Sequence, residues 1–145
     1  MSPSPRLEPV MNIRLLAATA VLVSAAVHLY LWFEGMRDAD VVGPAFMLNA
    51  VGGALIALLL VAWQHWIPPF LALGFGLSTL TAFVVAATVG LFGVEESWTG
   101  WAVWTAAVAE VVAIVTGGLL LLQDNPLRSR TQAQHHSPAG GAHLN

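Results

Sequence analysis

Residues 100–122 read GWAVWTAAVAEVVAIVTGGLLLL, a stretch in which Glu110 is the one ionisable side chain. A helix of about 20 apolar residues crosses the roughly 30 Å hydrocarbon core of a bilayer. The stretch is long enough for such a helix and contains no proline that would break it. It therefore predicts a transmembrane helix that carries a single acid near its middle.

The composition of the whole chain also indicates a membrane protein. Hydrophobic residues make up 57% of the 145 residues and charged residues 9%, with a mean hydropathy of +0.75. So few charges cannot cover a soluble globule of this size. Together with the opening stretch, the apolar blocks predict an all-α bundle of four transmembrane helices at residues 13–34, 43–65, 69–93 and 99–122.

The apolar blocks admit two other interpretations, a transmembrane barrel and a cleaved signal peptide. A transmembrane barrel needs segments of alternating polarity, and no stretch of the sequence alternates in that way. The first block resembles a signal peptide, because Ser24-Ala25-Ala26 has the small residues of a cleavage site. Its apolar run continues to Phe33 and is longer than the usual hydrophobic region of a signal peptide, which favours a membrane anchor.

The placement of arginine predicts the orientation, because the chain has no lysine. Arg6 and Arg14 precede the first helix and Arg128 and Arg130 follow the fourth, which predicts that both termini are cytoplasmic. The short connection at residues 64–69 predicts antiparallel neighbours, so the helices are expected to form two antiparallel hairpins. The outer loops are then acidic. Their carboxylates are Glu34, Asp38, Asp40, Glu95 and Glu96.

The two tails differ in composition from the membrane domain at residues 13–123. Residues 1–12 form a short cytoplasmic tail, and residues 124–145 are rich in Pro, Ser, Gln, His and Gly and are expected to be disordered. The pair His135-His136 and the nearby His143 suggest a metal site. A flexible tail gives histidines no fixed geometry, so no metal or other cofactor is predicted.

Two rows of small residues predict close helix packing. Gly74, Ser78, Ala82, Ala86 and Gly90 recur at every fourth position of the third helix, and Ala45, Asn49, Gly53 and Ala57 do so in the second. Helices approach closely in lipid where their side chains are small. We expect these two faces to meet, either within one chain or between copies of it.

Polar residues inside the membrane are the candidate functional site. Counting 1.5 Å per residue from the helix ends places Glu110 near the middle and His28, Asn49, Thr88 and Thr105 in the outer half. An ionisable group at such a depth is a functional candidate by default. On one interior face these residues would line a recess that opens toward the acidic loops. The alternative is that Glu110, His28 and Asn49 have a structural role and form hydrogen bonds that hold the helices together.

Several classes of function have no support in the sequence. Phosphate-binding loops, nucleophile elbows and zinc helices are absent, so no enzyme is predicted. A net charge of −3 with five basic residues argues against nucleic acid as a partner. A haem- or quinone-binding redox subunit is an alternative, but His28 and His65 are predicted at opposite ends of the bundle and could not share one haem iron.

Five motifs carry a resemblance to a known group of proteins. They are AVHLYLW at 26–32, GP at 43–44, LNAV at 48–51, VGLFG at 89–93 and WTAAVAE at 104–110. In these motifs the chain, from about Arg14 to Leu122, resembles uncharacterised small four-helix integral membrane proteins of high-GC Gram-positive bacteria. The resemblance implies the same topology and a bacterial plasma membrane, and it implies no mechanism.

The expected function is that of a multi-pass accessory or complex-forming subunit of the bacterial plasma membrane, with an outward-facing cation or proton site. Its expected partners are the lipid bilayer and either further copies of itself or a larger membrane complex. A small oligomeric proton-coupled transporter is the rival. Small multidrug transporters have a comparable size and an essential acid, but theirs lies in the first helix and Glu110 lies in the fourth.

Overall fold

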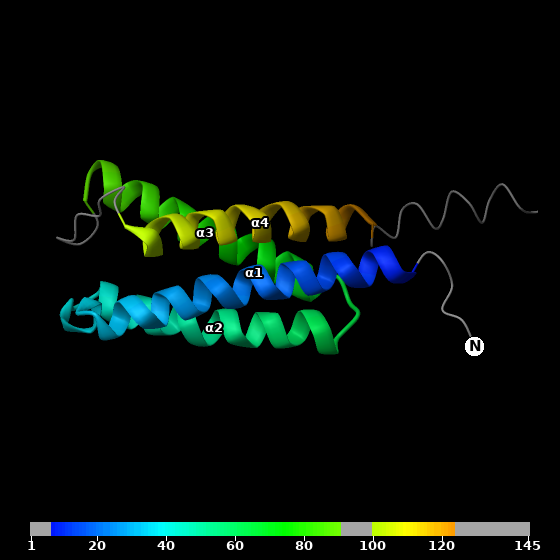
Figure 1. The fold of residues 1–145 in the computed structure, drawn as a ribbon, viewed down its shortest axis with the longest axis horizontal. Helices are drawn as coiled ribbons and strands as arrows, with labels where there is room; N and C mark the ends of the chain where they lie inside the picture. Colours follow the sequence, from blue (N-terminus) through cyan, green and yellow to red (C-terminus); the bar gives the residue numbers. More distant parts are fainter. Residues whose placement is uncertain (1–6, 91–99, 124–145) are drawn as a thin grey trace, which may run out of the picture.

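A computed structural model describes residues 7–90 and 100–123 of the chain as an all-helical protein (Figure 1). Each of the four long helices is long and apolar enough to cross a membrane. The helices are α1 Leu7–Phe33, η1 Met36–Asp38, α2 Val42–Ala62, α3 Ile67–Thr88 and α4 Trp101–Gln123. Residues 1–6 of the N-terminal tail predicted at 1–12, the predicted tail at 124–145, and Glu95 and Glu96 lie outside the described residues. Residues 7–12 belong to helix α1.

The helix starts differ from the prediction where prolines occur. Helix α1 begins at Leu7 and not at residue 13, and Pro9 falls in its first turn. Helix α3 begins at Ile67 and not at residue 69, with Pro68 and Pro69 in its first turn. The first backbone N–H groups of a helix have no partner within the helix, so proline is tolerated there. These prolines start helices without breaking them.

Two helix ends come earlier than predicted. Helix α2 ends at Ala62 and not at residue 65, because Trp63 has an extended backbone conformation. Helix α3 ends at Thr88 and not at residue 93. Gly90 follows with a φ of 79°, a left-handed conformation that glycine adopts at low cost and that stops a helix.

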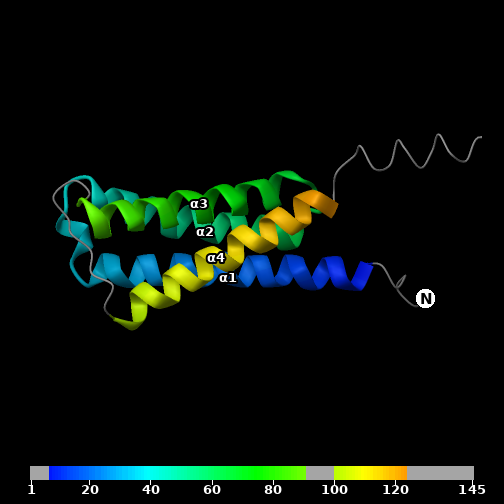
Figure 2. The same cartoon turned by 90° about the horizontal axis from the view of Figure 1, so that it is seen from above.

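The helices run back and forth along one axis (Figures 1 and 2). Helix α1 packs extensively against α2 and α4, and α3 packs against α4, whereas α2 and α3 touch over a smaller area. We call the end at which α2 joins α3 the Arg14 end, because Arg14 lies there, and the opposite end, where η1 joins α1 to α2, the η1 end. The small contact between α2 and α3 leaves one side of the bundle incompletely closed.

The hydrophobic core fills the half of the bundle toward the Arg14 end. All four helices contribute buried side chains to it, among them Val21, Leu60, Ala72, Ala113 and Leu120. Helix α1 is the most buried of the four helices within the protein. In its most apolar 18-residue stretch 44% of the residues are buried, against 17–33% in the other three helices. The pocket between the four helices lies in the other half.

Three glycines allow the helices to approach one another closely. A Cβ atom on Gly53 would lie 2.8 Å from Cβ of Ala25 and 3.0 Å from the ring of Phe75. A Cβ atom on Gly76 would lie 2.8 Å from the backbone carbonyl oxygen of Glu110. Gly117 is placed in the same way against the backbone of α3. The close approach that small residues allow in membranes therefore joins α3 to α4 as well as α1 to α2.

Within one chain, the small faces of α2 and α3 do not meet along their length. The two helices approach at Gly53 and Phe75, but a Cβ atom on Gly74 would have no neighbour within 4 Å. Toward the η1 end, Ala45 and Ala82 line a pocket that separates the two faces. The reason is that α3 turns its Gly76 face to α4, which leaves its row of small residues partly unpacked.

Candidate functional site

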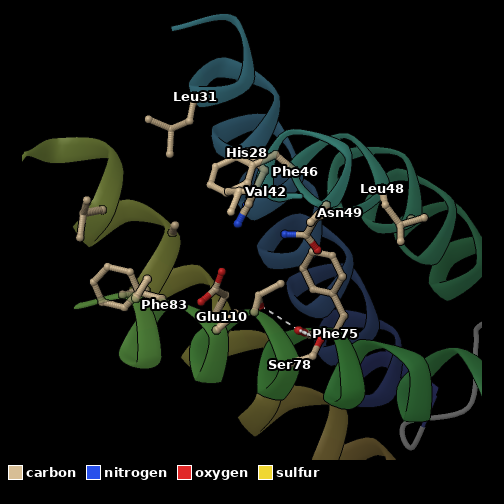
Figure 3. A pocket seen from close by; sticks show the side chains of 18 of the residues that line it. His28, Leu31, Val42, Phe46, Leu48, Asn49, Phe75, Ser78, Phe83 and Glu110 are labelled. Carbon is tan, nitrogen blue, oxygen red and sulfur yellow. Dashed lines mark hydrogen bonds between the residues drawn. The ribbon is translucent and has the colours of Figure 1, made fainter. Parts of the chain in front are cut away.

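A pocket of about 470 Å³ lies between the four helices in the half toward the η1 end (Figure 3). It extends from Leu31 and Val41, near that end, to Phe75 and Glu110 in the middle of the bundle. Its walls are mainly apolar, and much of its volume exists because several wall positions are glycine or alanine. Small side chains that were expected to bring helices together here leave room for a ligand.

Glu110 is the acid of the pocket and is almost fully buried, with 2% of its surface exposed. The hydroxyl group of Ser24 on α1 donates a hydrogen bond to its Oε1 atom over 3.2 Å. Across residues 7–90 and 100–123 no salt bridge reaches this carboxyl group. The protein thus buries an acid between helices and supplies it with hydrogen bonds and no counter-ion.

Thr79 on α3 is the second polar neighbour of the Glu110 carboxyl group. Its own hydroxyl hydrogen is directed to the carbonyl oxygen of Phe75, 2.8 Å away, so the Thr79 oxygen is left as an acceptor. Ser24 therefore donates to the carboxyl group, and the Thr79 oxygen is available to accept a hydrogen from a protonated Glu110. This pair of partners suits a carboxylic acid that carries a proton, because an ionised carboxylate has no hydrogen to donate.

His28 reaches the pocket from α1, one helical turn beyond Ser24. Its Nδ1 atom lies 2.8 Å from the backbone carbonyl oxygen of Ser24. A carbonyl oxygen only accepts, so Nδ1 carries the hydrogen and Nε2 of the neutral ring has a free lone pair. Phe46 holds the ring from the other side, with the ring centres 5.0 Å apart. The imidazole is therefore oriented, with an acceptor atom left for a ligand.

Asn49 completes the polar groups from α2. Its Nδ2 atom is buried and has no hydrogen-bond partner among the described residues. A buried donor without an acceptor costs about 1–3 kcal/mol, so native proteins rarely leave one in place. Figure 3 shows the Asn49 amide, the His28 ring and the Glu110 carboxyl group facing the same space from three helices.

The structure brings together three of the five predicted intramembrane residues, namely Glu110, His28 and Asn49. Thr88 is exposed, and its hydroxyl donates to the carbonyl oxygen of Val84 in its own helix. Thr105 donates to the carbonyl oxygen of Trp101 and lies in a separate groove between α1 and α4. Their depth was similar to that of the other residues, but their helix faces differ, so Thr88 and Thr105 do not belong to the pocket.

The predicted acidic loop is present in part. Glu34, Asp38 and Asp40 are exposed at the η1 end, and Asp38 lies 3.7 Å from the guanidinium group of Arg37. Such an exposed pair contributes little to stability. These carboxylates lie at the same end of the bundle as the pocket.

Sequence reasoning missed Ser24 and Thr79. A signal was available for Ser24, because it precedes His28 by four residues and thus shares a helix face with it. In the sequence, Ser24 belongs to a stretch that resembles a signal-peptide cleavage site. In the structure it is completely buried between the helices. Thr79 had no comparable signal, since its partner belongs to another helix.

Arg14 has a structural role that its charge alone did not reveal. Only 3% of its surface is exposed, and its guanidinium group donates to the carbonyl oxygens of Leu60, Trp63 and His65. These carbonyl groups lie at the C-terminal end of α2, where a helix leaves acceptors unsatisfied and carries partial negative charge. Arg14 therefore fastens the α2–α3 connection to α1.

Paired histidine ligation of a haem is not supported by the positions of His28 and His65. Arg14 bonds to His65, and fourteen residues separate Arg14 from His28 on α1. At 1.5 Å per residue this corresponds to about 21 Å, too far for one iron. Within the described ranges no group of three metal-binding side chains occurs either.

The comparisons with known proteins add no relative. No protein-family model matches the chain, and neither a curated protein nor a solved structure matches it.

Proposed function

We propose that the chain is a multi-pass protein of a bacterial plasma membrane in which the pocket around Glu110 is an outward-facing proton and cation site. The observation that carries the proposal is the Glu110 carboxyl group, which is buried on the pocket wall with a donor and an acceptor beside it and no counter-ion among the described residues. A charge at such a depth is costly, so the group holds a proton until a cation takes its place.

The orientation rests on the arginine residues. Arg14 lies at the end of the bundle opposite η1, and the positive-inside rule assigns that end to the cytoplasm. In this proposal both termini are cytoplasmic, the helices form two antiparallel hairpins, and the η1 end with Glu34, Asp38 and Asp40 faces outward. The pocket then lies in the outer half of the membrane.

The proposal includes assembly into a homo-oligomer or a larger membrane complex, in which the protein is an accessory subunit. The pocket occupies one half of the bundle and the hydrophobic core fills the other. Four helices packed in this way leave no path across the membrane within one chain. A transport function would therefore require an interface between copies, and molar mass measured by light scattering in detergent tests this part.

Infrared titration of the Glu110 carboxyl band tests the proton site. The protein is reconstituted in nanodiscs, and the Glu110→Gln variant supplies the subtraction spectrum. We expect a band of the protonated acid that is lost as the pH rises. A Glu110 band that stays constant across the pH range in which the protein is folded would make the group a hydrogen-bonding link between α1 and α4, and the proposal would fail.

A further inference from the structure

We propose that the ligand of the pocket is a lipophilic amine that enters from the outer leaflet between α2 and α3 and displaces the proton on Glu110. The inference rests on the proposed proton site and adds the chemical class of the cation and its route. It is carried by three features of the pocket, namely where it opens, what lines it and which polar atoms it leaves without partners.

The pocket opens sideways toward lipid. Wall residues on the facing sides of α2 and α3 are exposed, including Ala45, Ser78 and Ala82. Leu48 is 74% exposed and lies at the same opening. Helices α2 and α3 make a smaller contact than α1 with α2 or α3 with α4, and the pocket opens between them. A ligand that takes this route must first dissolve in the bilayer, so it carries a substantial apolar body.

The walls fit an apolar body with a positive charge. Phe46, Phe75 and Phe83 line the pocket, one from α2 and two from α3. Aromatic faces attract cations within about 6 Å of the ring centre, and more strongly where water is excluded. Most of the other lining residues are aliphatic, and Glu110 is the one acid among the described residues of the wall, so a positive charge on the ligand is neutralised there.

The polar atoms of the pocket determine which polar groups the ligand carries. The Glu110 carboxylate and Nε2 of His28 are both acceptors, which suits the N–H groups of an ammonium ion. The Asn49 amide is a donor without a partner, which suits an oxygen elsewhere on the ligand. A protonated amine with a hydroxyl, ether or carbonyl oxygen satisfies all three groups.

The exchange conserves charge within the membrane. In this proposal the empty pocket holds neutral Glu110, with the Thr79 oxygen available as the acceptor for its hydrogen. When an ammonium ion enters, the carboxyl proton leaves to solvent, and the carboxylate and the ammonium ion form a neutral pair. His28 is the one other titratable side chain on the pocket wall, and the pocket residues of α2 and α3 that the structure describes include none. Because the His28 ring is neutral, with its Nδ1 hydrogen on the carbonyl oxygen of Ser24, a proton released on binding comes from Glu110.

Three related probes separate charge from hydrophobicity. Naphthylethylamine carries both the apolar body and the charge, naphthylethanol has the body without the charge, and ethylamine has the charge without the body. Binding of each is measured in protein-containing nanodiscs, with empty nanodiscs as the correction for partition into lipid. The Glu110→Gln variant tests the role of the acid, and Thr105→Val is the matched control on the same helix outside the pocket.

We expect naphthylethylamine to bind more tightly than either partial analogue, and Glu110→Gln to weaken its binding by about tenfold or more while leaving naphthylethanol unchanged. Thr105→Val should bind all three like the unchanged protein. Equal binding of naphthylethanol and no effect of Glu110→Gln would overturn the inference and make the pocket a site for a neutral ligand, such as a quinone. Binding no greater than in empty nanodiscs would also overturn it.

The infrared titration distinguishes this failure from failure of the proposed function. If Glu110 titrates but naphthylethylamine binds no better than its analogues, the proton site stands and the amine inference is wrong. If Glu110 does not titrate, both are wrong.

Discussion

The hydroxyl group of Ser24 on α1 donates a hydrogen bond to Oε1 of Glu110 on α4 over 3.2 Å, and the two residues are separated by 86 positions in the sequence. Ser24 also contributes the carbonyl oxygen that orients His28. One turn of α1 thus holds both the acid and the imidazole of the pocket in place. The predictions below follow from this arrangement and from the helix contacts that support it.

Ser24→Ala removes the donor to Glu110. We expect the C=O stretching band of the protonated acid to move to higher wavenumber, because the carbonyl oxygen loses a hydrogen bond, and stability to fall by about 1 kcal/mol. Infrared difference spectra and unfolding in detergent measure the two effects. Thr105→Val is the control and should leave the band in place. An unchanged band in Ser24→Ala would show that this hydrogen bond does not form in the membrane.

Gly76→Ala forces α3 away from the backbone of Glu110. The new Cβ atom would lie 2.8 Å from a backbone oxygen, so we expect a loss of about 1–3 kcal/mol of stability. Gly74→Ala, two residues away in the same helix, has open space around its Cβ atom and should be neutral or stabilising by up to about 1 kcal/mol. Thermal unfolding of both variants measures the difference, and equal effects would contradict the packing of α3 on α4.

Arg14→Ala leaves three carbonyl groups at the end of α2 without their donor. Hydrogen bonds from a charged group contribute about 1.5–3 kcal/mol, so we expect a loss of about that size and faster hydrogen exchange in residues 60–67. The control Arg37→Ala removes an exposed guanidinium group and should cost less than about 1 kcal/mol. Similar losses in both variants would contradict the capping role of Arg14.

Asn49→Leu replaces a buried amide whose Nδ2 atom has no partner. In the ligand-free protein we expect stability to be unchanged or to rise by about 1–2 kcal/mol, because an unsatisfied donor is removed. Binding of an amine that carries an oxygen should weaken in the same variant. If the ligand-free Asn49→Leu protein is instead clearly destabilised in thermal unfolding, the amide has a partner and is not held free for a ligand.

The four helices were predictable because the signal is strong. Each apolar block is as long as the bilayer is thick, and membrane burial requires the backbone to satisfy its own hydrogen bonds. The ends were less predictable, since Pro9, Pro68 and Pro69 look like breakers in sequence and become first-turn residues in the structure.

The sequence predicted how deep each residue of the candidate site lies in the membrane, but not which of these residues face one another. Depth along a helix follows from counting residues, which placed His28 and Asn49 in the outer half with Glu110 deeper, and these three residues line one pocket. Which face of each helix points inward depends on the packing of all four helices, and Thr88 and Thr105 were misplaced for that reason. The pocket itself was not visible in the sequence, because a small residue predicts contact and cavity equally well.

The central claim is that Glu110 gives up a proton when an amine occupies the pocket. The most direct measurement is the number of protons released into a weakly buffered suspension of protein-containing nanodiscs on addition of naphthylethylamine, at a pH at which infrared spectra show Glu110 protonated. We predict close to one proton released for each amine bound, and none from the Glu110→Gln variant. Saturating binding without proton release, or equal release from the variant, would contradict the claim.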